Sequence, residues 1–260
     1  MKRKKFSIII KNVDNISAIS SLDQNKFNKC DFEYLIVNNN IKNIDKYIAN
    51  NNKFHVLSNT NIANAISKIS GDYVMIINSC DIFVSTVFDN ILKAIEMCDA
   101  DIIHFNSCQY NQNTNSNDPL DYIFNKTDIM NFAFNYLSEF CFKRDILTTI
   151  FSSDRVILIN ALLNTQNMVN YSQNYLITKK HDYIDPNEYI DIIDNYFVMK
   201  KYASEKFWKK YFYNLIPKMI QTMVKSNDKE KFFIAVKKTP WKFIPWRYKI
   251  IFWVFKMVAK

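Results

Sequence analysis

The sequence lacks an apolar run of the roughly 20 residues that a membrane-spanning helix requires, so we expect no transmembrane segment. Glycine is nearly absent as well. It occurs once, at Gly71, directly after a predicted helix, where we expect a helix end with positive φ. The five cysteines are scattered, odd in number and without CxxC spacing. This pattern argues against a disulfide framework or a zinc site, and it favours reduced thiols in a cytoplasmic protein.

Acidic residues are absent from residues 237–260, which contain seven of the chain's lysines and arginines. Four more basic residues lie at positions 2–5. These two ends account for the net charge of +9, and the rest of the chain is close to neutral. A nucleic-acid binder more often spreads its basic residues across a folded face, so this distribution argues against nucleic acid as a partner.

The sequence does contain enough hydrophobic material for a sizeable core, since 48% of its 260 residues are hydrophobic and 15% are aromatic. From residue 6 to residue 107, apolar runs alternate with segments at helix spacing. The predicted strands cover residues 6–10, 32–37, 53–58, 72–77 and 100–107, and the predicted helices cover 16–22, 61–70 and 87–97. This alternation predicts an α/β fold with a doubly wound, mostly parallel sheet.

Polar residues follow three of these strands, most clearly in GDYVMIINSCDIF (Gly71–Phe83), where an apolar strand stops at a polar cluster. Sheets of this kind bind ligands at the carboxyl ends of their strands. The polar residues found there are Lys11, Asn12 and Asp14, then Asn38 and Asn39, then Asn78 to Asp81. We therefore expect a binding site at that edge of the sheet.

A polar segment at 109–121 is the predicted boundary between this region and a second one, in which the pattern turns helical. Residues 128–142 and 155–163 carry apolar residues at helix spacing, and 189–213 is a long charged and aromatic stretch without glycine or proline. His55 and His104 fall in predicted strands, where we expect them to be core or edge residues.

Four segments stand in a recognisable order: SIIIKNVDN (Ser7–Asn15), LIVNNNI (Leu35–Ile41), KISGDYVMIINSCD (Lys68–Asp81) and SDRVILINALLNTQNMV (Ser153–Val169). In that order they resemble glycosyltransferase family 2 enzymes with the GT-A fold. Those enzymes carry SIIIPxYN, VDDGS, ATGEYI followed by LDSDD, and an ED motif before a helix. The resemblance covers residues 6–180 and is nearest to bacterial enzymes that build capsule, lipopolysaccharide or lipooligosaccharide.

The resemblance implies transfer of a sugar, with inversion, from a nucleotide-sugar donor, expected to be a UDP-sugar, to a glycan or lipid-linked acceptor. It implies Asp154 as the general base that takes the acceptor hydroxyl proton, and Asp81 as a ligand of Mn²⁺ or Mg²⁺ on the donor diphosphate. The nucleotide-sugar site would contain Lys11, Asp14, Asn38, Asn39, Asn78, Asp81, Lys179 and His181. Residues 1–108 would form the nucleotide-sugar-binding half, 109–215 the acceptor-side half, and 216–260 a basic aromatic helical region.

The sequence departs from the family pattern at its acidic positions. Asn38 and Asn39 replace the acids that contact the base, Asn78 replaces the first acid of DxD, and Cys80 stands where a metal-binding acid is expected. Mg²⁺ and Mn²⁺ prefer oxygen ligands, so we expect a weakened metal site. Asparagine can still hydrogen-bond to a base or a ribose.

Each of these residues also has a purely structural interpretation. Asp81 and Asp154 could cap the helices that follow them, Cys80 could be a small buried residue, and residues 179–181 could form a solvated basic turn. The lost acids support a second hypothesis for the whole chain. It would be a catalytically inactive GT-A-fold subunit that interacts within a glycan-assembly complex.

The segment TPWKFIPWRYKIIFWVFKMVAK (Thr239–Lys260) predicts an amphipathic helix with an aromatic and aliphatic face and basic flanks. The expected face is Trp246, Ile250, Trp253, Val254 and Met257, flanked by Lys242, Arg247, Lys249, Lys256 and Lys260. Such a helix favours the surface of an anionic bilayer, although a helix docked on the protein's own core is the alternative. With the resemblance, it predicts a cytoplasmic enzyme that is peripheral to the inner membrane.

Overall fold

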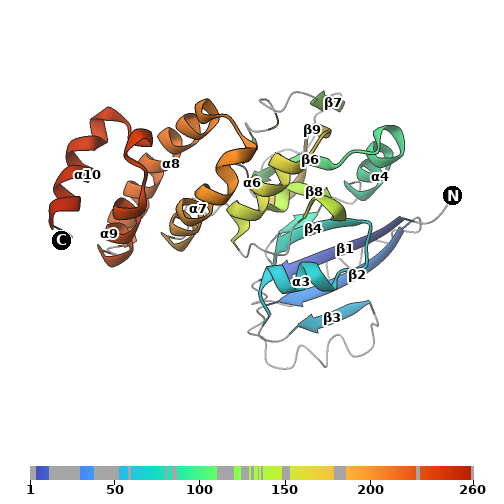
Figure 1. Cartoon of the computed structure of the whole chain (residues 1–260). Helices are drawn as coiled ribbons and strands as arrows, with labels where there is room; N and C mark the ends of the chain where they lie inside the picture. Colours follow the sequence, from blue (N-terminus) through green and yellow to red (C-terminus); the bar gives the residue numbers. More distant parts are fainter. Residues whose placement is uncertain are drawn as a thin grey trace. The chain divides into compact units, whose positions relative to one another are not determined.

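The computed structural model describes residues 4–11, 30–37, 53–57, 60–79, 81–83, 87–109, 120–123, 129, 132–133, 135, 137–147, 153–178, 186–226 and 229–258 (Figure 1). The chain divides into two compact units. The sheet unit contains Met1–Ser152 and Ile157–Lys180, and the helical unit contains Ser153–Val156 and His181–Lys260. The helix α6 (Asp154–Asn164) therefore belongs to both units.

The sheet unit is built on nine strands in its described residues. The first four are β1 (Lys4–Lys11), β2 (Cys30–Val37), β3 (Phe54–Leu57) and β4 (Tyr73–Asn78), and they pair in parallel in the order β3-β2-β1-β4. The others are β5 (Ile82–Phe83), β6 (Ile102–Gln109), β7 (Leu120–Ile123), β8 (Phe140–Lys143) and β9 (Met168–Thr178). The order continues β4-β8-β6-β9-β5, with β7 paired to β9.

The predicted α/β fold is confirmed, and the predicted strands and the two described N-terminal helices appear close to their expected bounds. The helices are α3 (Ile62–Lys68), capped by the Asn61 side chain, and α4 (Val87–Cys98). The helical prediction for residues 128–142 is wrong in its last part, which forms the 3-10 turn η2 (Leu137–Glu139) and enters β8. The apolar residues Phe140–Phe142 are buried in β8, which lies between β4 and β6. A short apolar run is compatible with either a buried strand or a buried helix, so the sequence pattern alone did not distinguish the two.

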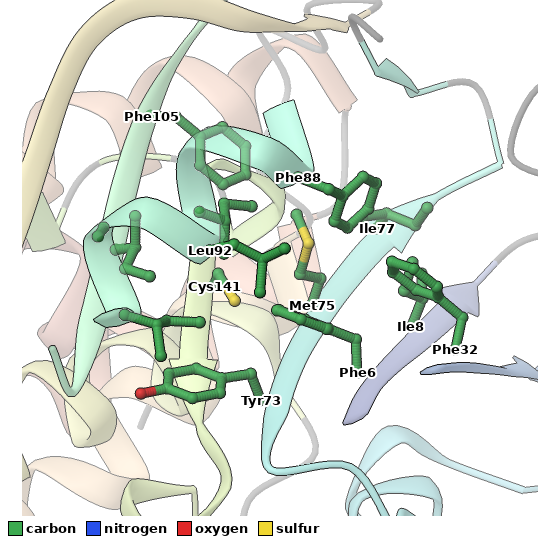
Figure 2. Packing of buried hydrophobic residues seen from close by; sticks show 14 of the residues in the cluster. Phe6, Ile8, Phe32, Tyr73, Met75, Ile77, Phe88, Leu92, Phe105 and Cys141 are labelled. Carbon is green, nitrogen blue, oxygen red and sulfur yellow. The ribbon is translucent and has the colours of Figure 1, made fainter. Parts of the chain in front are cut away.

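The core of the sheet unit forms where alternate residues of the parallel strands meet helix α4 (Figure 2). Phe6, Phe32 and Phe88 lie together there, with the rings of Phe32 and Phe88 5.0 Å apart in an edge-to-face arrangement. The intervening residues Ile9 and Ile76 are buried as well. Both faces of these strands are thus covered, as the doubly wound architecture requires.

Gly71 does not have the positive φ that the sequence predicted; in the described residues the conformation occurs at Asp99, just after α4. Glycine is needed for a different reason. A Cβ atom at this position would lie 2.6 Å from the Ser7 nitrogen and 2.8 Å from the Phe6 carbonyl carbon. The turn into β4 therefore packs directly on the backbone of β1, and only a residue without a side chain fits.

The buried carboxylate of Glu33 ties β2 to this same turn. It accepts hydrogen bonds from the hydroxyls of Ser7 and Ser70 and from the backbone N–H groups of Ser70 at 2.6 Å and Gly71 at 3.2 Å. Burial raises the pKa of Glu33, but these hydrogen bonds and the charge of Lys5 outweigh it and bring the pKa to about 2. The carboxylate stays ionised at neutral pH and holds three segments together.

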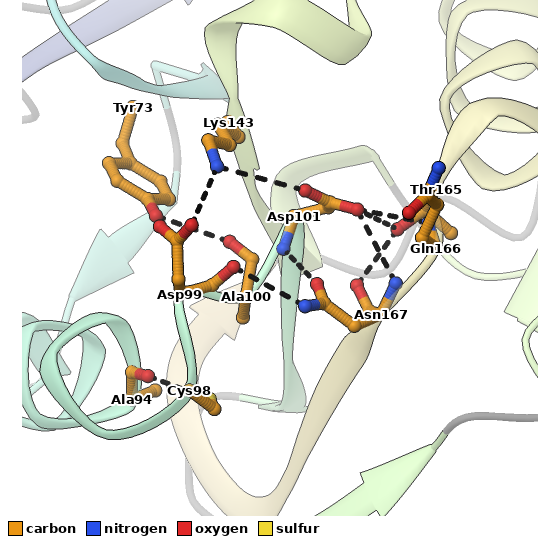
Figure 3. Close-up of polar contacts among 10 residues, drawn as sticks. All are labelled: Tyr73, Ala94, Cys98, Asp99, Ala100, Asp101, Lys143, Thr165, Gln166 and Asn167. Carbon is orange, nitrogen blue, oxygen red and sulfur yellow. Dashed lines mark hydrogen bonds and ion pairs between the residues drawn. The ribbon is translucent and has the colours of Figure 1, made fainter.

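A second polar cluster lies at the amino ends of β6 and β9 (Figure 3). The Asp101 carboxylate accepts from the backbone N–H groups of Gln166 at 2.9 Å and Asn167 at 3.4 Å, and the Asn167 side chain accepts from the Asp101 N–H at 2.6 Å. Lys143, at the end of β8, forms an ion pair with Asp99 at 3.0 Å. These contacts join the end of α6 to the sheet, at the edge opposite the predicted site.

The helical unit packs around aromatic side chains. Its elements are α7 (Pro186–Met199), α8 (Glu205–Ser226), α9 (Lys229–Lys238) and α10 (Trp246–Val258), with 3-10 turns at Lys200–Tyr202 and Trp241–Phe243. The rings of Phe212 and Phe243 stack at 4.9 Å, and Tyr196 and Trp208 meet edge to face at 5.2 Å. Among the described helices, none combines the length and the hydropathy that crossing a bilayer would require.

Replacing Gly71 tests the close approach of this turn to β1. We expect Gly71→Ala to lower the free energy of unfolding by about 1–3 kcal/mol, because the added methyl group meets backbone that cannot move aside. Chemical denaturation measures the difference. Lys68→Ala, at an exposed helical position nearby, is the control and should change stability little. Equal stability of both variants would contradict the packing described.

Candidate functional site

The carboxyl ends of three parallel strands lie at one edge of the sheet. Lys11, the last residue of β1, pairs with Val37 of β2 on one side and with Asn78 of β4 on the other. Register therefore brings together the ends of β1, β2 and β4, where sheets of this class bind ligands. Two predicted site residues, Lys11 and Asn78, are neighbours on adjacent strands as a result.

A tight turn at the end of β4 adds Asp81 to this pair. The backbone N–H of Asn78 donates to the Asp81 carboxylate at 2.8 Å, and the Asp81 N–H donates to the Asn78 carbonyl at 3.0 Å. The Ser79 N–H donates to the Lys11 carbonyl at 3.1 Å and extends the ladder by one residue. The turn folds the Asp81 side chain back onto the strand end instead of directing it along the chain.

The Asp81 side chain is almost completely buried, with 2% of the residue exposed. Burial raises the pKa of its carboxyl, and three neighbours oppose that rise. They are the Asn78 backbone N–H, the Ser138 hydroxyl and the positive charge of Lys11. The carboxylate thus already has hydrogen-bond donors and a counter-charge from the protein itself.

Among the described residues, these surroundings supply few of the oxygen ligands that a divalent metal ion takes. Mg²⁺ and Mn²⁺ take several oxygen ligands, whereas Asp81 is the single carboxylate among Lys11, Asn78, Asp81 and Ser138, and the ammonium group of Lys11 would repel a cation. In the described part of the chain, no group of three or more His, Cys, Asp or Glu side chains could hold a metal.

Ser138 on the turn η2 hydrogen-bonds to Asp81, although no sequence motif marks Ser138 as a site residue. The next residue of that turn, Glu139, lies 3.9 Å from the Nε2 atom of His104 on β6. The two ring nitrogens of buried His104 are hydrogen-bonded to Asn170 at 2.6 Å and to Asn135 at 2.8 Å. His104 is thus a core residue, as predicted, within a polar network that no sequence pattern marks.

Asp154, the predicted general base, is the first residue of α6 and is partly buried. A carboxylate in the first turn of a helix is stabilised by the helix dipole, so this location suits the structural interpretation as well as the catalytic one. Next to it, Arg155 is buried in the helical unit beside Tyr189 and Tyr211. The role of Asp154 stays a prediction.

The remaining predicted site residues are Asp14, Asn38, Asn39, Lys179 and His181, and all five lie outside the described residues. Cys80 lies outside them as well. The structure therefore brings together three predicted residues, Lys11, Asn78 and Asp81. The division at 1–108, 109–215 and 216–260 also stays a prediction.

No protein-family model matches the sequence, and no curated protein matches it either. The fold does have close counterparts, and it is GT-A-like. A crystal structure of S. aureus TarS, residues 1–349, is similar with a TM-score of 0.68 at 12% identity, covering 98% of this chain and 88% of that one. The same TarS segment in complex with UDP-GlcNAc is similar with a TM-score of 0.71 at 13% identity and the same coverage.

A more distant neighbour is glucosyl-3-phosphoglycerate synthase from Mycobacterium tuberculosis in complex with Mg²⁺ and UDP. It has a TM-score of 0.50 at 10% identity and covers 74% of this chain and 79% of that one. At these identities the likeness shows the fold. Two of the proteins that share it were solved with a uridine nucleotide or nucleotide-sugar.

The raised pKa of Asp81 predicts how an uncharged replacement will behave. Above its folded pKa the ionised Asp81 lowers stability, so Asp81→Asn should raise the melting temperature at pH 7. The amide oxygen can still accept from the Asn78 N–H. The gain in melting temperature should vanish below pH 3.8, which is the ordinary pKa of an aspartate side chain. Below that pH the Asp81 carboxyl is protonated in both the folded and the unfolded chain.

Thermal unfolding across this pH range measures the effect. Asp145→Asn, where the side chain is 79% exposed, is the matched control and should show no such pH-dependent gain. A destabilised Asp81→Asn variant at pH 7 would mean that the charge of Asp81 is required by the fold.

Proposed function

We propose that this protein is a glycosyltransferase that moves a sugar, with inversion, from a UDP-sugar to a hydroxyl of a surface glycan or lipid-linked acceptor. The observation that carries the proposal is the GT-A-like fold, matched over 98% of the chain by a structure that holds UDP-GlcNAc. The polar residues at the ends of β1 and β4 support it, because they stand at the edge where such sheets bind ligands.

In the proposed reaction, the acceptor hydroxyl gives its proton to the carboxylate of Asp154. The acceptor oxygen then forms a bond to the anomeric carbon of the sugar, the bond between that carbon and the diphosphate oxygen breaks, and UDP leaves. A base within reach of the hydroxyl makes the oxygen a better nucleophile as the bond forms. The family resemblance assigns this role to Asp154.

The leaving UDP gains negative charge, which an electropositive site must offset. Lys11 stands at the end of β1 beside Asn78 and could supply this charge, and the resemblance adds Lys179 and His181. The resemblance also implies Mn²⁺ or Mg²⁺ at Asp81. Since the described surroundings of Asp81 contain a single carboxylate, no step of the proposal depends on a metal ion.

Donor binding is the first test. We expect UDP and a UDP-sugar to raise the melting temperature more than GDP or CMP, and we expect added Mn²⁺ to change that rise little. Lys11→Gln should weaken UDP binding by about 10–100-fold, the range for a lost hydrogen bond to a charged group. Lys93→Gln, at an exposed position on α4, should bind as the wild type does.

Isothermal titration gives these affinities directly. A strict requirement for Mn²⁺ would show that metal ligands come from residues beyond the described ones. No binding of any nucleotide by the folded protein would contradict the proposed function itself.

Loss of the base is the second test. Asp154→Asn should lower the transfer rate by about 10²–10⁴-fold, because a general base contributes about that much, while UDP affinity stays unchanged. Transfer of labelled sugar to acceptor, with release of UDP, measures the rate. Asp145→Asn, an exposed acid elsewhere on the chain, is the control.

The outcome also separates the enzyme from an inactive subunit with the same fold. Wild-type transfer that survives Asp154→Asn would disprove the assignment of the base but keep the enzyme. Nucleotide binding without transfer by the wild type, across donors and acceptors, would favour the inactive subunit.

A further inference from the structure

Helix α10 carries a continuous apolar face that the rest of the described protein leaves uncovered. Its residues are Trp246, Ile250, Trp253, Val254 and Met257, called here the α10 face. Trp246 is 81% exposed, Ile250 74% and Trp253 55%. At 3.6 residues per turn these five side chains span about 100° of the helix, so they form one stripe.

The opposite side of the same helix is used for folding. Phe252 is fully buried, and α10 contacts α9, its neighbour in Figure 1. The preceding turn is anchored by Phe243 and Ile244, which are also buried. A helix docked on the protein's own core and a helix with a free apolar face were alternatives from sequence, and the structure contains both at once on different sides of α10.

Basic residues flank the α10 face. Arg247 is exposed on one side of the stripe, and Lys249 lies on the other, 5.8 Å above the ring of Trp241. Two further lysines of this region form ion pairs with acids of other helices, Lys238 with Asp194 and Lys242 with Glu205. Helix α10 itself contains three basic residues and no acid, so the helix that carries the stripe has an excess of positive charge.

We propose that the α10 face binds the surface of an anionic phospholipid bilayer, with α10 lying in the plane of the interface. Exposed tryptophans, aliphatic side chains and flanking basic residues together match the boundary between acyl chains and negatively charged headgroups. A hydrophobic protein partner would fit the apolar stripe, but it would not account for the excess of positive charge beside it.

The dimensions of α10 fit this orientation. Its 13 residues make a helix of about 20 Å, shorter than the hydrocarbon core of about 30 Å. Insertion would therefore be shallow, with Trp246 and Trp253 below the headgroups and Arg247 and Lys249 among them. The inference concerns the helical unit alone and holds whether or not the protein transfers sugar.

Vesicle binding by the full chain tests the inference. We expect the protein to sediment with vesicles made of equal parts phosphatidylglycerol and phosphatidylcholine, and much more weakly with phosphatidylcholine alone. Binding should weaken as salt rises to about 1 M, where the screening length falls to about 3 Å. The tryptophan emission should shift to the blue on binding, because Trp246 and Trp253 leave water.

Two sets of variants separate the apolar and the charged parts of the interaction. Replacing Trp246, Ile250 and Trp253 by alanine should weaken binding at least about 100-fold, since each side chain loses its burial in the bilayer. Arg247→Gln with Lys249→Gln should weaken binding about 25-fold on anionic vesicles, from about 1 kcal/mol for each residue near the surface. Substitution is preferable to deletion, because Phe243 and Phe252 are buried.

Matched controls come from exposed residues elsewhere. Phe197→Ala with Val198→Ala removes exposed apolar side chains from α7, and Lys68→Gln with Lys93→Gln removes exposed charges from the sheet unit. Both should bind vesicles as the wild type does, and far-ultraviolet circular dichroism confirms that each variant is folded.

Three results would overturn the inference. The first is failure of the folded wild type to bind anionic vesicles, and the second is binding by the alanine variant that is as tight as that of the wild type. The third is an oligomer of the wild type that the alanine variant converts to a monomer, without vesicle binding by either, which would assign the α10 face to a second copy of this chain.

Discussion

The contact between the turn at Gly71 and the backbone of β1 is the constraint on which the candidate site depends. No side chain fits between Gly71 and Ser7, and the buried carboxylate of Glu33 binds both Ser7 and the turn. β1 is thereby held against β2 on one side and β4 on the other, in one register. That register makes three strands end together, so an interaction at the amino ends of the strands determines what meets at their carboxyl ends.

Among the described residues at those carboxyl ends, one acid, Asp81, lies beside one basic residue, Lys11. Asp81 is buried beside Lys11, Asn78 and Ser138, which partly offset the cost of burying its charge. A site with several carboxylates needs a bound cation to balance their negative charge, whereas a site with one carboxylate and one lysine does not. The proposed function, in which basic side chains meet an anionic donor, agrees with the replacement of acids by asparagine in this sequence.

In the helical unit, tryptophan occurs both in the buried core and on the exposed surface. Trp208 is buried and packs edge to face against Tyr196, while Trp246 is almost fully exposed. The stacked rings of Phe212 and Phe243 anchor the turn that precedes α10, and the inner side of α10 carries the buried Phe252. In the described part of the chain, α10 is docked through its inner side while its outer apolar side chains stay exposed.

The sequence by itself determined the α/β class, the parallel strands β1 to β4, the helices α3 and α4, and the grouping of Lys11, Asn78 and Asp81 at one edge. Periodicity and strand ends carry that information, because side-chain spacing follows directly from local geometry. It also predicted the residues of the α10 face, since these share one side of a regular helix. Tertiary structure alone decided the strand β8 and the contact of Ser138 with Asp81, because both depend on segments distant in the chain. It also decided why position 71 must be glycine: the reason is the backbone of β1, 64 residues away, and not the local φ angle.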